Sequence, residues 1–405
     1  MAMESKEKLI EELLMRGVEN IYPSEEFLRS KLVSGSRLTV YLGIDPTGPT
    51  LHMGHIIPLL KLRIFQKLGH QVVLLLGDFT AMIGDPTDKM ATRVPLSREQ
   101  VLGNASLYKD QASMFIEFGG ENGALLKYNS EWLGKLSFQE TLELMSHMTH
   151  AQMIKRDMFQ KRIGEGKDLF LNEFLYPLMQ GYDSVAMDVD GEVGGNDQTF
   201  NMLAGRDLLK RMKGKEKFVI TTKLLADAEG IKMGKTTGNM IALVDTAEEM
   251  FGKVMSWTDG MILPGFELCT DIAIAQIGRI KKELEGGANP RDAKLLLAHE
   301  VVKLFKGEEA AKAGKEYFEK TIQHKGVPEV LRVVSFSPGL SWVDLLVHAG
   351  FAKSKSDARR LIEQGGVSFA VGEEFVKITD PKAQNDKSGK LKVGSHRFVE
   401  IEVGA

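Results

Sequence analysis

Residues 38–76 limit the folds open to this chain more than any other segment does. Residues 38–44 are rich in strand-forming side chains, residues 45–50 have turn composition, and residues 55–68 carry apolar side chains at helical spacing. Residues 71–76 form a continuous apolar run, which is typical of a parallel strand buried on both faces. Two such strands joined through a helix need a right-handed crossover. We therefore predict a doubly wound, Rossmann-like α/β sheet with ligands at the carboxyl ends of its strands.

The rest of the chain is expected to fold around and after this sheet. Residues 97–170 have a mostly helical pattern with few strand signals, and we expect a helical insertion between two halves of the sheet. Residues 217–225 predict a further strand, followed by a glycine-rich loop at residues 229–239. Residues from 246 to about 323 are nearly all helical by pattern. A chain of 405 residues suggests about three domains, which we place at residues 1–245, 246–330 and 337–405.

Charge and cysteine content exclude several classes of protein. The formal net charge of -3 gives no global basic signature, so a nucleic-acid partner would need a local basic patch. The single cysteine, Cys269, excludes an internal disulfide framework and a four-cysteine zinc site, and favours a reducing, cytoplasmic location. The N-terminal residues lack the apolar core of a signal peptide, and no apolar run approaches the roughly 20 residues that span a bilayer.

A pair of histidines opens the predicted helix after the first strand, in the run Leu51-His52-Met53-Gly54-His55. The two imidazoles are three residues apart and therefore share one face of a helix. The start of a helix offers unpaired N–H groups and a favourable dipole to phosphate, and Gly54 would let a purine approach. The alternative is a pair of capping or core histidines. The position after a strand favours the phosphate site.

Two lysines three residues apart lie in the predicted glycine-rich loop, in the run Lys232-Met233-Gly234-Lys235-Thr236. Such a loop could close over the β- and γ-phosphates of a nucleotide. The alternative is an ordinary solvated lysine loop. Because both motifs follow strands of one predicted sheet, in this order, we favour phosphate chemistry.

These motifs resemble the His-Ile-Gly-His and Lys-Met-Ser-Lys-Ser signatures of class I aminoacyl-tRNA synthetases. Residues 41–47, 77–87, 176–183 and 194–198 further resemble the bacterial tyrosyl-tRNA synthetase family, so the resemblance covers essentially the whole chain. Gly234 and Thr236 stand where serines are usual, which leaves the charge of the loop intact.

The resemblance implies a set of site residues. For tyrosine it implies Tyr41, Thr80, Asp85, Tyr176, Gln180, Asp183 and Gln198, with Tyr41 and Asp183 on the phenol. For ATP it implies Asp45, Thr47, Gly54, Lys89, Arg93, Asp197 and Met233. For catalysis it implies His52, His55, Lys232, Lys235 and Thr236. By spacing alone, Tyr176 and Gln180 are equally consistent with a helix face that packs on the sheet.

The last segment resembles the small RNA-binding domain first known from a ribosomal protein. Its pattern is helix, helix, strand, and Lys353, Lys355, Arg359 and Arg360 would form a local basic face for RNA phosphates. The alternative is a solvated amphipathic helix. By the same resemblance, residues 246–330 would bind the anticodon arm.

The implied activity is that of a tyrosyl-tRNA synthetase. It forms tyrosyl-adenylate and pyrophosphate from L-tyrosine and ATP, then transfers tyrosine to the 3'-terminal ribose of tRNA(Tyr). ATP is a substrate that brings magnesium, no protein-ligated metal is expected, and the resemblance implies a homodimer without membrane attachment. The rival hypotheses are a small-molecule nucleotidyltransferase, a tryptophanyl synthetase and a non-catalytic RNA-binding relative.

Overall fold

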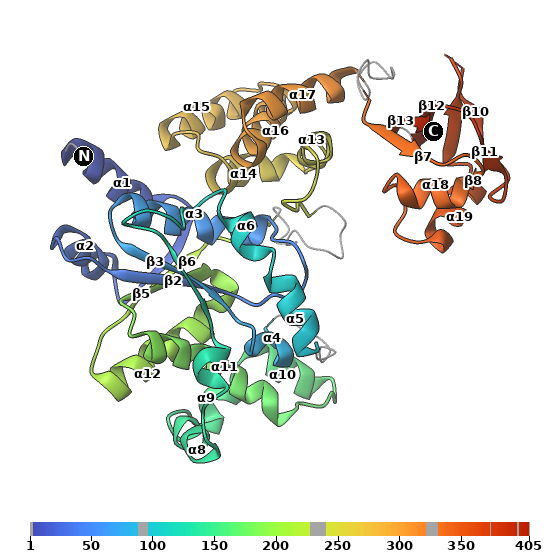
Figure 1. Ribbon diagram of the computed structural model, residues 1–405. Coiled ribbons are helices and arrows are strands. Elements are labelled where there is room, and N and C mark those ends of the chain that lie inside the picture. The colour runs from blue at the N-terminus through green and yellow to red at the C-terminus, as the bar shows by residue number, and fades with distance from the viewer. Residues whose placement is uncertain are drawn as a thin grey trace. The chain divides into compact units, whose positions relative to one another are not determined.

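The computed structural model describes residues 3–87, 96–226, 240–320, 331–372, 374–394 and 397–404. Figure 1 shows the course of the chain. It divides into two compact units, Met1–Ala311 and Lys312–Ala405. None of the described helices combines the length and apolar character needed to cross a bilayer.

A six-stranded sheet forms the centre of the first unit, with strand order β1-β6-β5-β2-β3-β4. The strands, in that order, are Val18–Tyr22, Phe218–Thr222, Gly191–Gly195, Thr39–Ile44, Gln71–Leu76 and Leu125–Tyr128. All neighbours are parallel except β1, which runs antiparallel to β6. The predicted doubly wound parallel sheet is confirmed, and the strands predicted at residues 38–44 and 71–76 are its central pair, β2 and β3.

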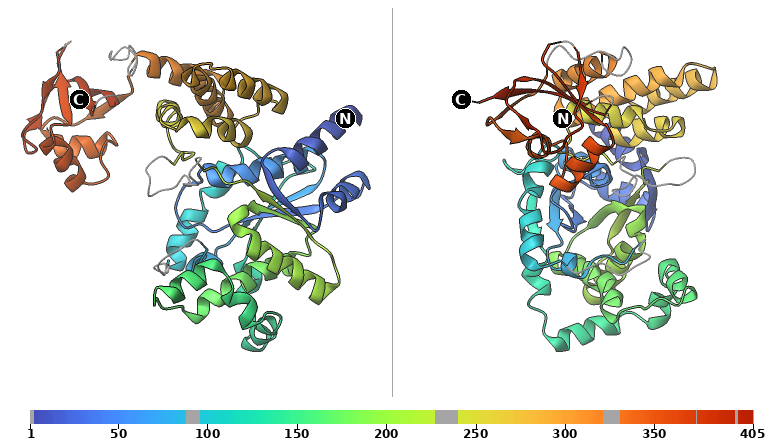
Figure 2. Two further views of the ribbon diagram at one scale, coloured as in Figure 1. Left: turned by 180° about the vertical axis from the view of Figure 1, so that it is seen from behind. Right: turned by 90° about the vertical axis from the view of Figure 1, so that its right-hand side faces the viewer.

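Helices cover both faces of this sheet (Figures 1 and 2). Helix α3, Met53–Lys67, packs on β2, β3 and β5 from one side. Helices α11, Leu171–Met187, and α12, Thr199–Lys213, pack against each other on the other side, where α12 contacts β5 and β6. Burial on both faces explains why β3 is almost wholly an apolar run and why all five residues of β6 are buried.

The order of the strands reverses between β2 and β5. From β2 the chain proceeds outward through β3 to β4, whereas from β5 it proceeds outward through β6. The connections that follow β2 and β5 therefore diverge, which leaves a crevice beyond the carboxyl ends of these two strands.

The predicted insertion at residues 97–170 is helical, but it is not only helical. Its helices are α5 (Arg98–Ala105), α6 (Tyr108–Ala112), α7 (Ser130–Leu133), α8 (Phe138–Ser146), α9 (His150–Ile154) and α10 (Asp157–Gly164). Between α6 and α7, however, β4 pairs in parallel with β3 as the edge strand of the sheet. Strand β4 was not predicted because it has only four residues and none of them is fully buried, so its apolar pattern is weak.

The glycine-rich strand β5 was also not predicted. Three of its five residues are glycine, a composition that disfavours a strand. A Cβ at Gly191 would lie 2.1 Å from the ring of Phe218 on the neighbouring strand β6. Tertiary packing therefore requires glycine at this position, against the local propensity.

A helical segment completes the first unit and agrees with the pattern read from residue 246 onward. Its helices are α13 (Ala247–Met255), α14 (Ile262–Cys269), α15 (Ile274–Glu285), α16 (Pro290–Lys306) and α17 (Glu308–Phe318), the last of which continues into the second unit. The free thiol of Cys269 is buried at the end of α14.

The second unit is a small α+β domain, as predicted for the tail. Two helices, α18 (Trp342–His348) and α19 (Lys355–Glu363), pack on a sheet of order β10-β9-β12-β13-β7. These strands are Val376–Lys377, Val367–Ala370, Gly389–Val393, Arg397–Val403 and Val333–Phe336, and β8 (Leu340–Ser341) pairs separately with β11 (Gln384–Asn385). The predicted helix, helix, strand order corresponds to α18, α19 and β9.

Candidate active site at the strand-order reversal

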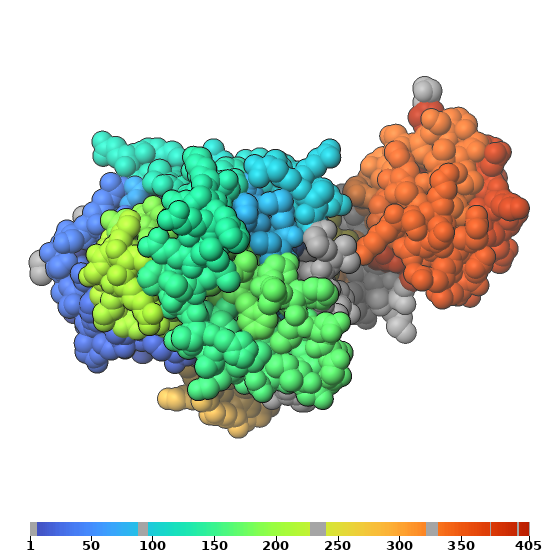
Figure 3. Space-filling view, turned by 90° about the horizontal axis from the view of Figure 1, so that it is seen from below, coloured from blue at the N-terminus to red at the C-terminus, as the bar shows by residue number. Residues whose placement is uncertain are grey.

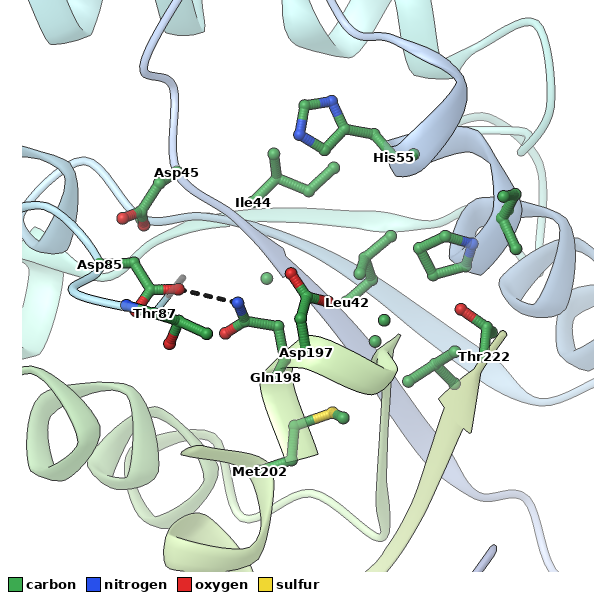
Figure 4. A pocket seen from close by; sticks show the side chains of 18 of the residues that line it. Leu42, Ile44, Asp45, His55, Asp85, Thr87, Asp197, Gln198, Met202 and Thr222 are labelled. Carbon is green, nitrogen blue, oxygen red and sulfur yellow. Dashed lines mark hydrogen bonds between the residues drawn. The ribbon is translucent and has the colours of Figure 1, made fainter. Parts of the chain in front are cut away.

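A cavity of about 460 Å³ lies at the reversal of strand order in the first unit. Its walls come from the ends of β2, β3, β5 and β6, the start of α3, and one face of α11. Figure 4 shows that side chains from these separate segments converge on the space, with His55 and Asp197 projecting from opposite sides. The fold therefore places a ligand-sized site where a doubly wound sheet is expected to have one.

The two histidines form one end of this cavity. His52 is the N-cap of α3 and His55 lies in its first turn, and their rings stack with centroids 3.8 Å apart. The backbone N–H of His52 donates to Nδ1 of His55 at 3.3 Å. A ring nitrogen that accepts carries no proton, so neutral His55 has its proton on Nε2. This end can offer an imidazole donor beside the N–H groups of a helix start, which suits an anion.

Gly54 serves this histidine pair in a way that the sequence did not reveal. A Cβ at position 54 would lie 3.1 Å from Cε1 and 3.2 Å from Nδ1 of His52. The expectation was that glycine makes room for a purine. The structure shows that glycine makes room for the stacked imidazole of His52, and the purine role stays a prediction.

The segments on both sides of residues 227–239 line the cavity, and the later one lies against the histidine motif. Before this stretch Leu224 and Leu225 line the cavity, and after it Met240 and Ile241 do. The backbone N–H of Met53 donates to the carbonyl of Ile241 at 3.1 Å, and that of Leu243 donates to the carbonyl of Leu51 at 3.1 Å. The chain that follows the lysine motif is thus bonded directly to the histidine motif.

Asp45 anchors a second polar cluster at the end of β2. Its Oδ1 accepts from Thr80 Oγ1 at 2.7 Å and its Oδ2 accepts from the Tyr176 hydroxyl at 2.8 Å. A Cβ at Gly77 would lie 2.0 Å from Asp45 Oδ1, so this approach requires glycine. Burial and the Asp45 carboxylate raise the pKa of Tyr176 well above its usual range, which keeps its hydroxyl a donor. Asp45, assigned to ATP from the sequence, is therefore bonded to two residues assigned to tyrosine.

Asp183 lies at the bottom of the cavity, with 2% of its surface exposed. Its Oδ1 accepts from Trp132 Nε1 at 2.8 Å and its Oδ2 accepts from Asn129 Nδ2 at 3.3 Å. Burial raises the pKa of the Asp183 carboxyl well above its usual range, and the two donors oppose this shift. Asn129 also donates to Thr80 Oγ1 at 3.0 Å, which joins this carboxylate to the Asp45 cluster.

Asp85 and Gln198 meet across the cavity. Gln198 Nε2 donates to Asp85 Oδ2 at 2.7 Å, as the dashed line in Figure 4 shows. Asp85 Oδ1 accepts from the backbone N–H of Thr87 at 2.9 Å. Asp197, beside Gln198 in the 3-10 turn Asn196–Gln198 after β5, also lines the cavity. Two carboxylates therefore face the space between the two ends.

Tyr41 and Gln180 complete the wall away from the histidines. The Tyr41 side chain is fully buried, and its hydroxyl lies 2.9 Å from Ser184 Oγ. Gln180 Nε2 donates to Glu192 Oε1 at 3.4 Å, while its Oε1 is buried without a hydrogen-bond partner among the described residues. An acceptor left open in a cavity rimmed with carboxylates suits a cationic group such as an ammonium.

Comparison with known proteins matches this geometry to one family. The profile described as tRNA synthetases class I (W and Y) matches residues 34–323. The tyrosine–tRNA ligase of Thermotoga maritima is 42% identical over 396 residues, which are 97% of each chain. That of Haemophilus influenzae is 42% identical over 393 residues, or 96% of each chain. This chain belongs to the tyrosine–tRNA ligase family.

Solved structures agree with this family in fold. A C-terminally truncated mitochondrial tyrosyl-tRNA synthetase of Coccidioides posadasii superposes with a TM-score of 0.62 at 25% identity, over 77% of this chain and 96% of that one. A corresponding protein of Aspergillus nidulans gives 0.64 at 23% identity, over 80% and 99%. Both cover less of this chain than the full-length ligases do.

The residues predicted for a tyrosine–tRNA ligase site fall into three groups. The cavity brings together Tyr41, Asp45, Thr47, His52, Gly54, His55, Thr80, Asp85, Tyr176, Gln180, Asp183, Asp197 and Gln198. Outside the described residues lie Lys89, Arg93, Lys232, Met233, Lys235 and Thr236. The basic residues Lys353, Lys355, Arg359 and Arg360 lie in the second unit, on and just before α19.

Sequence reasoning missed the partners that hold this ligase site together. Asn129 and Trp132 follow β4, inside a segment expected to be mostly helical, and Glu192 lies in the unpredicted strand β5. The short run Leu125-Leu126-Lys127-Tyr128, followed at once by Asn129 and three residues later by Trp132, is the signal that could have identified the first two. Among the described residues, no cluster of three or more His, Cys, Asp or Glu side chains is arranged to hold a metal ion.

Proposed function

We propose that this chain activates L-tyrosine with ATP and transfers it to the 3'-terminal ribose of tRNA(Tyr). One observation carries the proposal. A single cavity at the strand-order reversal joins a pair of stacked histidines at a helix start to a buried carboxylate, Asp183, that already has two protein donors. The first end fits the phosphates of a nucleotide, and the second fits the hydroxyl of a phenol.

In the first step the tyrosine carboxylate attacks the α-phosphate of ATP in line, and pyrophosphate leaves. A carboxylate is already a nucleophile, so no general base is required. His52 and His55 would stabilise the charge that develops on the phosphate, and catalysis would rest on positioning and electrostatics. Magnesium would enter with the nucleotide as part of the substrate. Lys232 and Lys235 would neutralise the leaving group, and Thr236 would help to stabilise the pentacoordinate phosphorus. The segments that flank their loop line the cavity.

Selection of tyrosine would rest on the buried end of the cavity. The substrate hydroxyl would donate to Asp183 and bond to Tyr41, and its ammonium would meet Asp85, Tyr176 and the open Oε1 of Gln180. Phenylalanine would leave the Asp183 carboxylate buried without that donor, and an unpaired buried polar group is costly. Indole does not match this arrangement either, because its N–H lies elsewhere on the ring.

The second unit would hold tRNA through its basic residues. All four predicted side chains are exposed, but Lys355 pairs with Asp344 and Arg360 pairs with Asp357, each at 2.6 Å. Lys353 and Arg359 have no ion-pair partner among the described residues and are the stronger candidates. The helical residues 246–330 would contact the anticodon arm. Alanine at Lys353 and Arg359 together should weaken tRNA binding and flatten its salt dependence.

The helical insertion would form the interface of a homodimer. Large apolar side chains are exposed on α8 and at the start of α11, led by Phe138 at 78% and Leu171 at 84%. Figure 3 shows these insertion helices, in green, at the surface of the first unit. Exposed apolar side chains of this size favour an interaction site. Glutamate at both positions should convert a dimer to a monomer in light scattering.

Formation of tyrosyl-tRNA(Tyr) tests the proposed function against its rivals. Tyrosine esterified to tRNA, resolved on an acid gel, is the expected result. Consumption of ATP without charging of tRNA would favour a small-molecule nucleotidyltransferase. Binding of tRNA without any use of ATP would favour a non-catalytic RNA-binding relative.

We assign the chain to the cytoplasm, where the single thiol of Cys269 stays reduced.

A further inference from the structure

A buried ion pair borders the part of the cavity formed by Tyr41, Gln180 and Asp183, which we call the amino-acid end. Lys217 precedes β6 and Glu192 lies in the neighbouring strand β5, and Lys217 Nζ donates to Glu192 Oε2. Their side chains are 0% and 3% exposed. Glu192 lines the cavity, and Lys217 stands behind it, where its Nζ also donates to Ser184 Oγ at 2.8 Å.

Such a pair is not explained by stability alone. Removal of two charges from water costs several kcal/mol for each ion, and apolar side chains of similar volume often serve a core equally well. Burial lowers the pKa of the Lys217 ammonium, and the Glu192 carboxylate opposes that shift. What distinguishes this pair is the identity of its other partners.

The chain contains a second buried ion pair that provides the contrast. Arg162 in α10 pairs with Glu173 in α11, with side chains 1% and 7% exposed. Arg162 also donates to the carbonyl of Asp168, and Glu173 accepts from the backbone N–H of Phe170 at 3.0 Å. These bonds fasten the connection between two helices, and neither charged residue lines the cavity.

One branch of the Lys217 network leads to Gln180. Glu192 Oε1 accepts from Gln180 Nε2 at 3.4 Å. An amide that turns its nitrogen toward Glu192 must turn its oxygen away, and this Oε1 is the buried acceptor left open at the cavity. The ion pair thus fixes which way the Gln180 amide faces.

The other branch leads to Tyr41. An ammonium can only donate, so Ser184 Oγ accepts from Lys217, and the same Oγ lies 2.9 Å from the Tyr41 hydroxyl. Lys217 Nζ also lies 5.7 Å from the centroid of the Tyr41 ring. The position of the tyrosine side chain at the phenol end therefore depends on the same lysine.

We infer that Lys217 and Glu192 are positioning residues for amino-acid selection. The pair orients Gln180 toward the substrate ammonium and holds Tyr41 toward the substrate phenol, without touching the reacting atoms. This inference rests on the proposed function. It adds two residues that neither the histidine motif nor the lysine motif contains.

The test replaces each pair by methionine in the full-length chain and compares the two double variants. K217M/E192M removes both charges, so no unpaired ion is left in the core. R162M/E173M is the matched control. For each variant we would measure the melting temperature and, by ATP–pyrophosphate exchange, the KM for tyrosine, the KM for ATP and the preference for tyrosine over phenylalanine.

In K217M/E192M the KM for tyrosine should rise about 10-fold, and the preference for tyrosine over phenylalanine should fall about 10-fold. These values are expected if the substrate loses one buried hydrogen bond at its ammonium and one at its phenol. The KM for ATP should stay within about two-fold. In R162M/E173M all three values should stay near those of the unaltered chain, whatever happens to its melting temperature. Unchanged tyrosine values in K217M/E192M, or equal changes in the control, would overturn the inference.

Ser184→Ala provides a second variant, which keeps both charges of the ion pair and the bond between them. It severs only the link from Lys217 to Tyr41, so the preference for tyrosine over phenylalanine should fall about five-fold. An unchanged preference would overturn the Tyr41 branch. If the unaltered chain shows no exchange with any amino acid, the proposed function fails. If it is active and the variants match it, only the positioning role fails.

Discussion

The two ends of the cavity are built in different ways. The amino-acid end consists of side chains on β2, α11 and the segment after β4 that already bond to one another, as Asp45 does to Tyr176 and Asp183 does to Trp132. The histidine end consists of a short motif at the start of α3 and the segment after residue 239 that is bonded to it. On the proposed function, amino-acid selection would be organised within the folded core, whereas the phosphate site would be assembled from motifs at the ends of strands.

This difference implies two classes of variant. Interactions made equally with the bound substrate and with the transition state affect KM and the preference for one amino acid over another. Interactions made only with the transition state affect kcat. We expect changes at the amino-acid end to alter the choice among amino acids. We expect changes at the histidine end to lower the rate for every amino acid alike.

The largest effect is expected for Asp183→Asn. The amide would present a donor to Trp132 or Asn129, and the charge that accepts from the phenol would be lost. These losses amount to about 4 kcal/mol, so kcat/KM for tyrosine should fall about 10³-fold while that for phenylalanine changes little. Asp78→Asn is the control, because Asp78 is 1% exposed and accepts two bonds from Ser130 outside the cavity lining. Equal losses for both amino acids would contradict the account.

A smaller effect, confined to kcat, is expected for His55→Ala. Loss of one donor to the developing charge on phosphate should lower kcat for exchange about 10²-fold. Equilibrium dialysis should show unchanged tyrosine binding. The control is His70→Ala, since His70 is buried beside Leu38 and does not line the cavity. A weakened affinity for tyrosine in His55→Ala would contradict the claim that the two ends of the cavity have separate roles.

Trp132→Phe sharpens the comparison at the amino-acid end. It removes one donor to the Asp183 carboxylate, a bond worth about 2 kcal/mol, so kcat/KM for tyrosine should fall about 30-fold. The matched control is Trp257→Phe, because Trp257 Nε1 is buried without a partner among the described residues. Steady-state exchange with tyrosine and phenylalanine measures both. If kcat/KM for tyrosine fell as much in Trp257→Phe as in Trp132→Phe, the loss would come from altered packing of the indole and not from its missing N–H.

The smallest effect is expected for Gly54→Ala. The new Cβ would displace the His52 ring by a few tenths of an ångström, so kcat should fall about three-fold. Alanine within a helix also stabilises it by about 0.5–1 kcal/mol, so the melting temperature should not fall. Gly103→Ala, in α5 with open space around it, should show the stabilisation without the loss of rate. A destabilised Gly54→Ala would mean that the clash spreads beyond His52.

The sequence predicted the two ends unequally. The histidine end was found because its residues are contiguous and follow a strand, so spacing alone placed His52 and His55 on one face. At the amino-acid end Tyr41, Tyr176, Gln180 and Asp183 came only from family resemblance. The partners Asn129, Trp132, Glu192 and Lys217 were not predicted. Two of them follow β4, one lies on the unexpected strand β5 and one precedes β6, and they meet only through tertiary packing.

The same contrast explains the errors in the fold. Strands β2 and β3 are long apolar runs whose pattern determines their structure. Strand β5 is mostly glycine because Phe218, Met202 and Asp197 approach its backbone closely, and that requirement is invisible in local propensity. Segments shaped by close approach to a site are the ones that pattern reasoning misreads.

The most direct test of the central claim is ATP–pyrophosphate exchange with tyrosine, phenylalanine and tryptophan measured in parallel. The account predicts rapid exchange with tyrosine and little with the other two, because only tyrosine supplies a hydroxyl to Asp183. Comparable exchange with phenylalanine or tryptophan would contradict the role given to the buried amino-acid end. No exchange with any of the three would contradict the activation chemistry itself.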